Sequence, residues 1–277
     1  MALADAHVHL FADGYAGAAG LLLRDEVRLY EQLRLNFGIE RALVVGYEGE
    51  ERYSGNSAYV LELARARPWI VPLVYLHHRD PSIEELRRFE AEGAAGYSIY
   101  VADEEGAHAV SSWPPPVLTE LNRQRAVISL NSTAAATTAI APFVDALGSC
   151  TVLFSHLGLP GRFATTPTRA QAAERLRPLL VLADRPNVRV KFSGLYAISD
   201  PAHDFPHDAA RPVLDVVLEA FGAERLCWGS DFAPALEFVS FPQLADDRLL
   251  SDLSSAEIAA VMGGNLQRLL PTVRERE

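Results

Sequence analysis

Short apolar runs alternate along this chain with longer stretches in which apolar residues recur every three or four positions. The short runs predict eight β-strands, at residues 4–10, 41–45, 70–76, 95–100, 126–130, 151–155, 188–192 and 226–228. The longer stretches predict helices between them, at residues 24–36, 56–66, from Ser82 onward, up to about Arg123, and at 137–147, 168–184, 209–221 and 255–270. Ser82 followed by Glu85 has the pattern of a capping box.

Strands that alternate with helices are typical of a parallel sheet covered on both faces. The chain has 277 residues, which is close to the usual size of one (β/α)8 barrel. We therefore predict an α/β fold, a (β/α)8 TIM barrel, with residues 1–277 as a single domain. A doubly wound open sheet is the alternative that the same pattern allows.

Composition narrows the class of protein. Hydrophobic residues make up 49% of the chain, enough for a large core. The net charge is -11, with 36 acidic against 25 basic residues, which argues against nucleic acid or an acidic membrane as a partner. Cys150 and Cys227 both lie in or beside apolar runs, so buried reduced thiols are expected. With no secretory pattern and no membrane-length apolar run, we expect a cytoplasmic protein.

Candidate catalytic and metal-binding residues stand at the ends of predicted strands. His7 and His9 end the first strand, and residues two apart on a strand point to the same face. His156 follows the sixth strand, Lys191 lies in the seventh and Asp231 follows the eighth. In a parallel barrel these ends meet at one rim. Three imidazoles and a carboxylate there suit zinc or manganese.

Five motifs together resemble a known family. In chain order they are Asp5-Ala6-His7-Val8-His9, Phe154-Ser155-His156-Leu157-Gly158, Val190-Lys191-Phe192-Ser193-Gly194-Leu195, Trp228-Gly229-Ser230-Asp231-Phe232 and Met262-Gly263-Gly264-Asn265. Their order, from residue 4 to about 270, resembles the amidohydrolase superfamily, and within it the amidohydrolase-2 group, which includes sugar lactonases and pyrone dicarboxylate lactonases. The resemblance implies a (β/α)8 barrel that hydrolyses esters, lactones or amides, with some decarboxylating members.

The resemblance also implies roles for individual residues. His7 and His9 would be first-strand metal ligands, and His156 would bind metal or polarise the scissile carbonyl. Asp231 would be both a ligand and the general base that takes a proton from the attacking water.

The chain departs from the superfamily pattern at two places. Asn131 stands where many metal-dependent members have a histidine, and no bridging lysine occurs in residues 96–100. Both departures argue against a dinuclear centre. We expect at most one divalent metal ion, zinc before manganese. Without a metal, Lys191 and His156 would stabilise the oxyanion electrostatically.

Loop residues complete the predicted site. The candidates for substrate contact are His77, Arg79, Tyr100, Arg162 and Tyr196. Near the C-terminus, the Gly263-Gly264 pair predicts a tight bend, and the Asn265 amide is expected to hold a backbone group.

The leading hypothesis for function is a hydrolase that opens a lactone or similar ester or amide with a water activated by Asp231. A metal-dependent decarboxylase with the same ligands is the alternative, and a barrel without catalysis is a third reading. The expected partner is a small-molecule substrate, and the sequence is compatible with a homo-oligomer.

Overall fold

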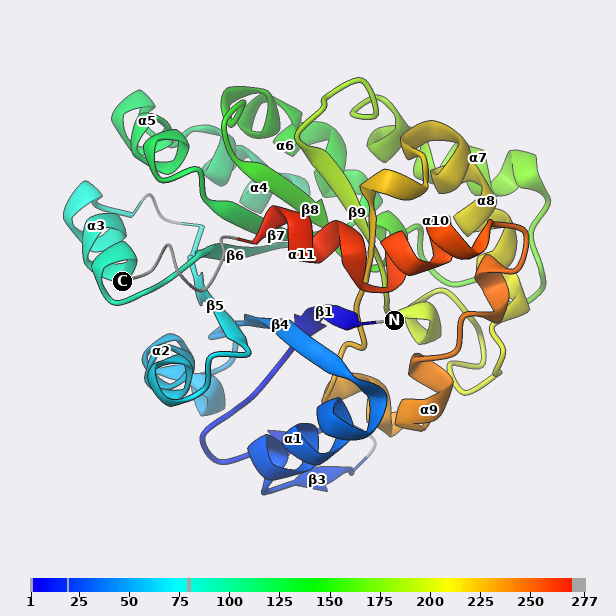
Figure 1. Cartoon of the computed structure of the whole chain (residues 1–277). Coiled ribbons are helices and arrows are strands. Elements are labelled where there is room, and N and C mark those ends of the chain that lie inside the picture. The colour runs from blue at the N-terminus through cyan, green and yellow to red at the C-terminus, as the bar shows by residue number, and fades with distance from the viewer. Residues whose placement is uncertain (1, 19, 79–80, 271–277) are drawn as a thin grey trace.

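The computed structural model describes residues 2–18, 20–78 and 81–270. Eight strands form one parallel sheet in chain order, closing toward a barrel with the helices around it (Figure 1). The strands are β1 (Leu3–Val8), β4 (Ile39–Val45), β5 (Ile70–Tyr75), β6 (Gly96–Val101), β7 (Val127–Ser132), β8 (Thr151–Phe154), β9 (Val188–Phe192) and β10 (Leu226–Trp228). Val8 makes a parallel bridge to Phe232, just after β10, which brings the last strand back to the first. The predicted (β/α)8 barrel is confirmed.

Helices connect the strands and cover their outer faces. They are α1 (Glu26–Phe37), α2 (Asn56–Ala66), α3 (Ile83–Ala91), α4 (Glu104–Ser111), α5 (Pro115–Gln124), α6 (Ala134–Ala146), α7 (Arg169–Leu180), α8 (Arg211–Phe221), α9 (Phe241–Leu244), α10 (Ser255–Ala259) and α11 (Asn265–Leu269). Short 3₁₀ helices lie in the loops, at Glu51–Tyr53, His156–Gly158, Leu195–Ala197, Asp208–Ala210, Ala223–Arg225, Pro234–Glu237 and Arg248–Leu250. Ser82 caps α3 with Glu85 in the predicted capping box.

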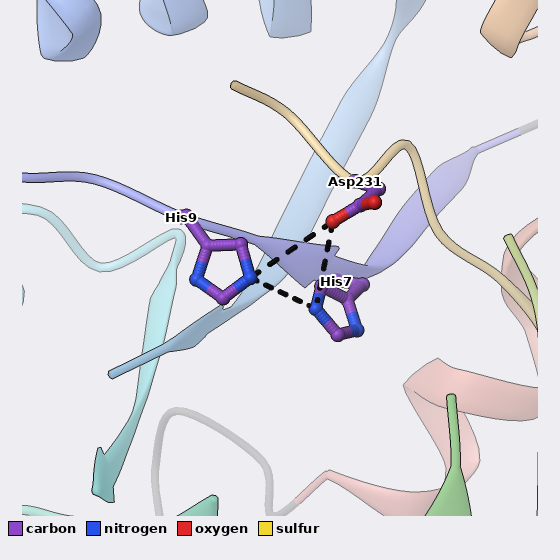
Figure 2. A group of neighbouring side chains, drawn as sticks. All are labelled: His7, His9 and Asp231. Carbon is purple, nitrogen blue, oxygen red and sulfur yellow. Dashed lines mark hydrogen bonds and ion pairs between the residues drawn. The ribbon is translucent and has the colours of Figure 1, made fainter. Parts of the chain in front are cut away.

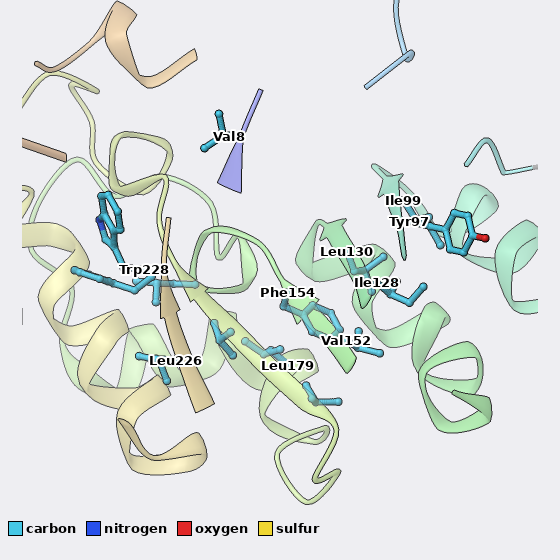
Figure 3. Packing of buried hydrophobic residues seen from close by; sticks show 14 of the residues in the cluster. Val8, Tyr97, Ile99, Ile128, Leu130, Val152, Phe154, Leu179, Leu226 and Trp228 are labelled. Atoms are coloured by element: carbon cyan, nitrogen blue, oxygen red, sulfur yellow. The ribbon is translucent and has the colours of Figure 1, made fainter. Parts of the chain in front are cut away.

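The strands are apolar on both faces because each face meets its own core. On β4, Ala42 and Val44 belong to a large cluster between the sheet and the helices. The residues that alternate with them, Leu43 and Val45, belong to a smaller second cluster. Figure 3 shows part of the large cluster, in which side chains of neighbouring strands pack side by side. This two-sided burial explains the near-continuous apolar runs in the sequence. Cys150 and Cys227 are buried and unpaired.

The structure also contains local features that the sequence analysis did not predict. A two-stranded hairpin, β2 (Tyr15–Ala16) with β3 (Leu22–Leu23), lies in the loop after β1, and the additional helix α4 follows β6. The single helix predicted for residues 255–270 is instead divided by a π-helical turn at Ala260–Gly264.

The glycine pair in that turn makes no tight bend, because the backbone at Gly264 stays helical, with φ -58°. Gly263 serves close packing instead. A Cβ there would lie 2.5 Å from the carbonyl oxygen of Ala2 and 2.7 Å from the amide of Ala4. Asn265 acts as predicted: its Nδ2 donates to the carbonyl oxygens of Ala223 and Leu226.

Among the helices that the structure describes, none combines the length and the apolar character needed to cross a membrane.

Candidate active site

Two buried imidazoles meet at the end of the first strand, with their rings in an edge-on arrangement. The Nε2 atoms of His7 and His9 lie 3.0 Å apart, and both side chains point toward Asp231 (Figure 2). The Nδ1 of His9 lies 2.8 Å from the carbonyl oxygen of Val45. A carbonyl can only accept, so Nδ1 carries the proton and Nε2 presents a lone pair. His9 is therefore oriented as a metal-binding histidine would be.

Asp231 approaches these histidines from the far end of the chain. Its Oδ1 lies 3.6 Å from the Nε2 of His7 and 3.9 Å from the Nε2 of His9. The residue has a left-handed backbone, with φ 55°, and its amide donates to the carbonyl of His7 at 2.8 Å. Gly229 permits this approach, because a Cβ there would lie only 2.9 Å from the Cβ of His7.

His156 completes the cluster from the turn after β8. Its Nε2 lies 3.9 Å from the Oδ2 of Asp231, and its Nδ1 lies 3.1 Å from the Oγ of Ser193. The ring needs a glycine beside it: a Cβ on Gly194 would lie 2.2 Å from its Nδ1. The Phe192-Ser193-Gly194 stretch therefore both orients His156 and leaves room for it.

The donor set fits one small divalent cation. One atom each from His7, His9 and Asp231 lies within 4.8 Å of the others. Metal–nitrogen bonds of about 2.0 Å in a tetrahedron separate ligands by roughly 3.3 Å, close to the distances found here. Burial lowers the pKa of His9 to about 4 and holds that of His7 well below its usual value. Both imidazoles are therefore neutral at pH 7, as metal ligands must be.

The surroundings of Asp231 shift the pKa of its carboxyl group upward. Burial raises its pKa to about 7, against the opposing effects of a hydrogen bond from Tyr196 and the positive charge of Lys191. The Tyr196 hydroxyl donates to Oδ2 at 2.5 Å. Oδ1 therefore faces His7 and His9, while Oδ2 accepts from Tyr196.

Lys191 lies behind the site rather than in it. Its side chain is fully buried, and its Nζ lies 2.9 Å from the Nδ1 of His7 and 2.6 Å from the Oγ of Ser129. Burial lowers its pKa to about 7. Because its ammonium does not line the pocket, the structure does not place Lys191 to touch an oxyanion directly, and it reaches the site through His7.

A cavity of about 310 Å³ opens above the cluster. Its floor contains His9, His156 and Asp231, so the site is accessible from outside. Six aromatic side chains line its wall: Phe11, Tyr15, Tyr47, Tyr53, Tyr100 and Tyr196. Asn131 also lines it, as do Glu50 and Arg52, whose charged groups pair with each other at 2.6 Å.

The structure brings only some of the predicted substrate-binding residues to this cavity. Tyr100 lines it, with its hydroxyl 3.2 Å from the Nε2 of His9, and so does Tyr196. His77 lines a different cavity, together with Tyr75. The His77 ring packs edge-on against the ring of Tyr75, which in turn contacts the ring of Tyr100.

Arg162 also lies elsewhere, in a surface cavity over α7, where its carbonyl accepts from Arg175. Arg79 lies outside the described residues.

Sequence reasoning missed most of the cavity wall. Tyr47 follows β4 by two residues and Phe11 follows β1 by three, so aromatic residues just after strands were the available signal. Tyr15, Glu50, Arg52 and Tyr53 come from the hairpin and the turn before α2, and no motif marks them.

Comparison with known proteins agrees with this architecture. A family model described as amidohydrolase matches residues 4–272. An L-fucono-1,5-lactonase of Burkholderia multivorans is 33% identical over 125 residues, a match that spans 42% of this chain and 42% of that relative.

Solved structures share the fold over their full length. An amidohydrolase from Burkholderia multivorans with bound zinc superimposes with a TM-score of 0.80 at 22% identity, covering 98% of this chain and 100% of that one. A 2,6-dihydroxybenzoate decarboxylase from Rhizobium gives a TM-score of 0.65 at 14% identity, covering 100% of both chains.

Proposed function

The chain belongs to the amidohydrolase family and is a hydrolase of that family, and from this premise we propose that it opens an uncharged lactone by adding water to the ring carbonyl. The observation that carries the proposal is the placement of Asp231. It lies on the floor of an open aromatic cavity, beside His9 and His156, with a pKa near 7. A carboxylate whose pKa lies near the working pH is well suited to general base catalysis.

The proposed reaction uses Asp231 twice. Its carboxylate accepts a proton from water while the water oxygen forms a bond to the lactone carbonyl carbon. When the ring C–O bond breaks, the carboxyl group returns that proton to the departing ring oxygen, which leaves a hydroxy acid. His156, in its Nε2-protonated tautomer, would donate to the carbonyl oxygen as negative charge develops there.

We also propose that His7, His9 and Asp231 hold one divalent ion, with zinc as the first choice. Such an ion, when bound, would polarise the carbonyl and lower the pKa of water. The solved amidohydrolase with bound zinc supports this choice.

The chemistry of the wall favours an uncharged ring as substrate. Six aromatic side chains offer flat apolar faces, and five of them carry hydroxyl groups that can bond to a polyhydroxylated molecule. Arg52 is the only lysine or arginine among the described residues of the cavity lining, and Glu50 already pairs with it. A substrate carboxylate would have to displace Glu50. The lactonase relative agrees with this preference for a lactone.

Replacement of Asp231 by asparagine tests the function. The asparagine is close to isosteric, and its amide cannot accept the proton of water, so we expect kcat on a responsive lactone to fall by about 10² to 10⁴-fold. Acid release from a lactone panel, followed with a pH indicator, is the measurement. Circular dichroism should show the fold unchanged. An Asp231→Asn enzyme with near-normal turnover would refute the assignment.

Decarboxylation is the second candidate, because a decarboxylase shares the fold. It requires a cation to hold the substrate carboxylate, and among the described residues that line the cavity the lysines and arginines are represented by Arg52 alone, which already pairs with Glu50. Incubation with aromatic and aliphatic acids, with carbon dioxide measured against acid release from lactones, separates the two reactions. Carbon dioxide release without lactone opening would replace our proposal.

A further inference from the structure

The metal-binding residues come from opposite ends of the sheet, and few interactions join those ends. Regular pairing runs from β1 through β4 and onward to β10. Between β1 and the β10 segment, the described residues show an isolated bridge between Val8 and Phe232. Asp231 donates to the carbonyl of His7, and His9 donates to that of Phe232. The relative position of His7 and Asp231 therefore depends on this narrow seam.

One carboxylate crosses the seam. The Oδ1 of Asp5 accepts from the amide of His7 at 3.0 Å and from the amide of Ser230 at 2.9 Å. Its Oδ2 accepts from the hydroxyl of Tyr30, on α1, at 2.9 Å. Asp5 is fully buried. It thus bonds to the backbone of one candidate ligand, His7, and to the residue just before another, Asp231.

A bulge in β1 explains why the carboxylate is needed. Asp5 pairs with Ala42 and Val8 with Val44, so β1 advances three residues where β4 advances two. In a regular strand Asp5 would share a face with His7. Because of the extra residue, the Asp5 side chain points toward α1 while the His7 side chain points toward Asp231. The buried amide of His7 then donates to the Asp5 carboxylate.

We propose that Asp5 is a positioning residue, a clamp across the barrel seam that holds His7 and Asp231 at the separation the site requires. It is not among the residues that line the cavity. The inference concerns the site whose function is proposed above, and it rests on that function only where turnover is the readout.

The test compares Asp5→Ala, Asp5→Asn and Tyr30→Phe. Alanine removes the acceptor for both amides, while asparagine keeps one oxygen that can accept from both. Tyr30→Phe removes only the bond to Oδ2. The readouts are the zinc dissociation constant, measured by competition with a chromophoric chelator, amide hydrogen exchange in peptides covering residues 3–9 and 226–232, and kcat with KM on a responsive lactone.

We expect Asp5→Ala to weaken zinc binding at least 10-fold, to speed exchange in both segments and to lower kcat with little change in KM. Asp5→Asn should remain within about threefold of the native protein, and so should Tyr30→Phe. Val188→Ala, a buried substitution at the start of β9, is the control for general destabilisation and should leave zinc affinity and kcat unchanged. If Asp5→Ala does not fold, Asp5→Ser replaces it. The serine hydroxyl is one bond closer to the backbone than the carboxylate oxygens, so it is too short to accept from both amides.

Native zinc affinity and native exchange in Asp5→Ala would overturn the clamp. So would equal losses in Asp5→Ala and Val188→Ala, which would mean a role in stability alone. If the native protein opens no lactone, the proposed reaction fails, and if it binds no zinc, the proposed metal site fails. In either case the amide exchange rates of the two segments still test whether Asp5 holds them together.

Discussion

Tyr196 contacts the candidate base, although a role in substrate binding was the sequence prediction for it. Its hydroxyl donates to the Oδ2 of Asp231 at 2.5 Å, and its ring stacks on Phe238. A hydrogen bond to a charged group contributes about 1.5 to 3 kcal/mol, so Tyr196→Phe should lower kcat roughly 10-fold or more with little effect on KM. Steady-state kinetics is the measurement. Tyr47→Phe, which removes a hydroxyl from the cavity wall, is the matched control and should change KM instead. A rise in KM at constant kcat in Tyr196→Phe would return Tyr196 to substrate binding.

Burial of the Glu26 carboxyl group makes the stability of the fold depend on pH. Its Oε2 accepts from the amide of Phe11 at 2.7 Å, and its Oε1 is buried with no hydrogen-bond partner among the described residues. Burial raises its pKa to about 8, above its ordinary value of 4.5. The folded protein therefore binds a proton that the unfolded chain has released between these two pH values. Stability consequently falls as the pH rises from about 4.5 to 8.

Glu26→Gln should remove this pH dependence, because the amide resembles the protonated acid. At pH 9 the variant should be more stable than the native protein, by at most about 5 kcal/mol, and near pH 4 the two should agree. Urea unfolding at a series of pH values measures the difference. Glu62→Gln, on the exposed side of α2, should show no such change. Parallel stability curves for Glu26→Gln and the native protein would contradict the prediction.

At the scale of elements, the π-helical turn requires a glycine at one of its two glycine positions. Gly263 packs against the backbone of β1 at Ala2–Ala4, so the methyl group of Gly263→Ala would overlap backbone atoms that cannot move aside. We expect destabilisation of about 1 to 3 kcal/mol or more, seen as a lower Tm. At Gly264 the methyl group would meet only the flexible end of Arg268 at 3.3 Å and a carbonyl at 3.4 Å. Gly264→Ala should therefore stay near the native Tm, and equal losses in the two variants would disprove this packing argument.

The sequence predicts the strands well because burial on both faces leaves unbroken apolar runs, as on β4. It predicts that His7, His9, His156 and Asp231 lie close together because the ends of the strands form the rim of a barrel. What it misses depends on contacts between distant residues. The path of the loop after β5 places His77 in another cavity. Residues 260–264 form a π-helical turn where they pack against the start of the chain near β1.

At the scale of the whole molecule, a metal ion would do more than assist chemistry. His7 lies in the first strand, His9 directly follows it and Asp231 follows the last strand, so an ion held by all three would cross-link the two ends of the sheet. Zinc at 100 times its dissociation constant should stabilise the fold by about 2.7 kcal/mol, and a chelator should reverse the gain. Differential scanning fluorimetry measures the shift in Tm, and elemental analysis should find one ion per chain. His9→Ala should show no shift. Two ions per chain, or a Tm insensitive to zinc, would exclude the single-ion site.

The seam between β1 and β10 also has a consequence for how this protein is made. The ribosome adds Ser230 and Asp231 more than two hundred residues after His7 and His9. During that time one edge of β1 lacks its neighbour, and an unpaired edge is a template for wrong pairing. The carboxylate of Asp5 then lacks the amide of Ser230 as a hydrogen-bond donor. A chain released before residue 226 would carry His7, His9 and His156 without Asp231, so the candidate site could be complete only after the last strand has been synthesised.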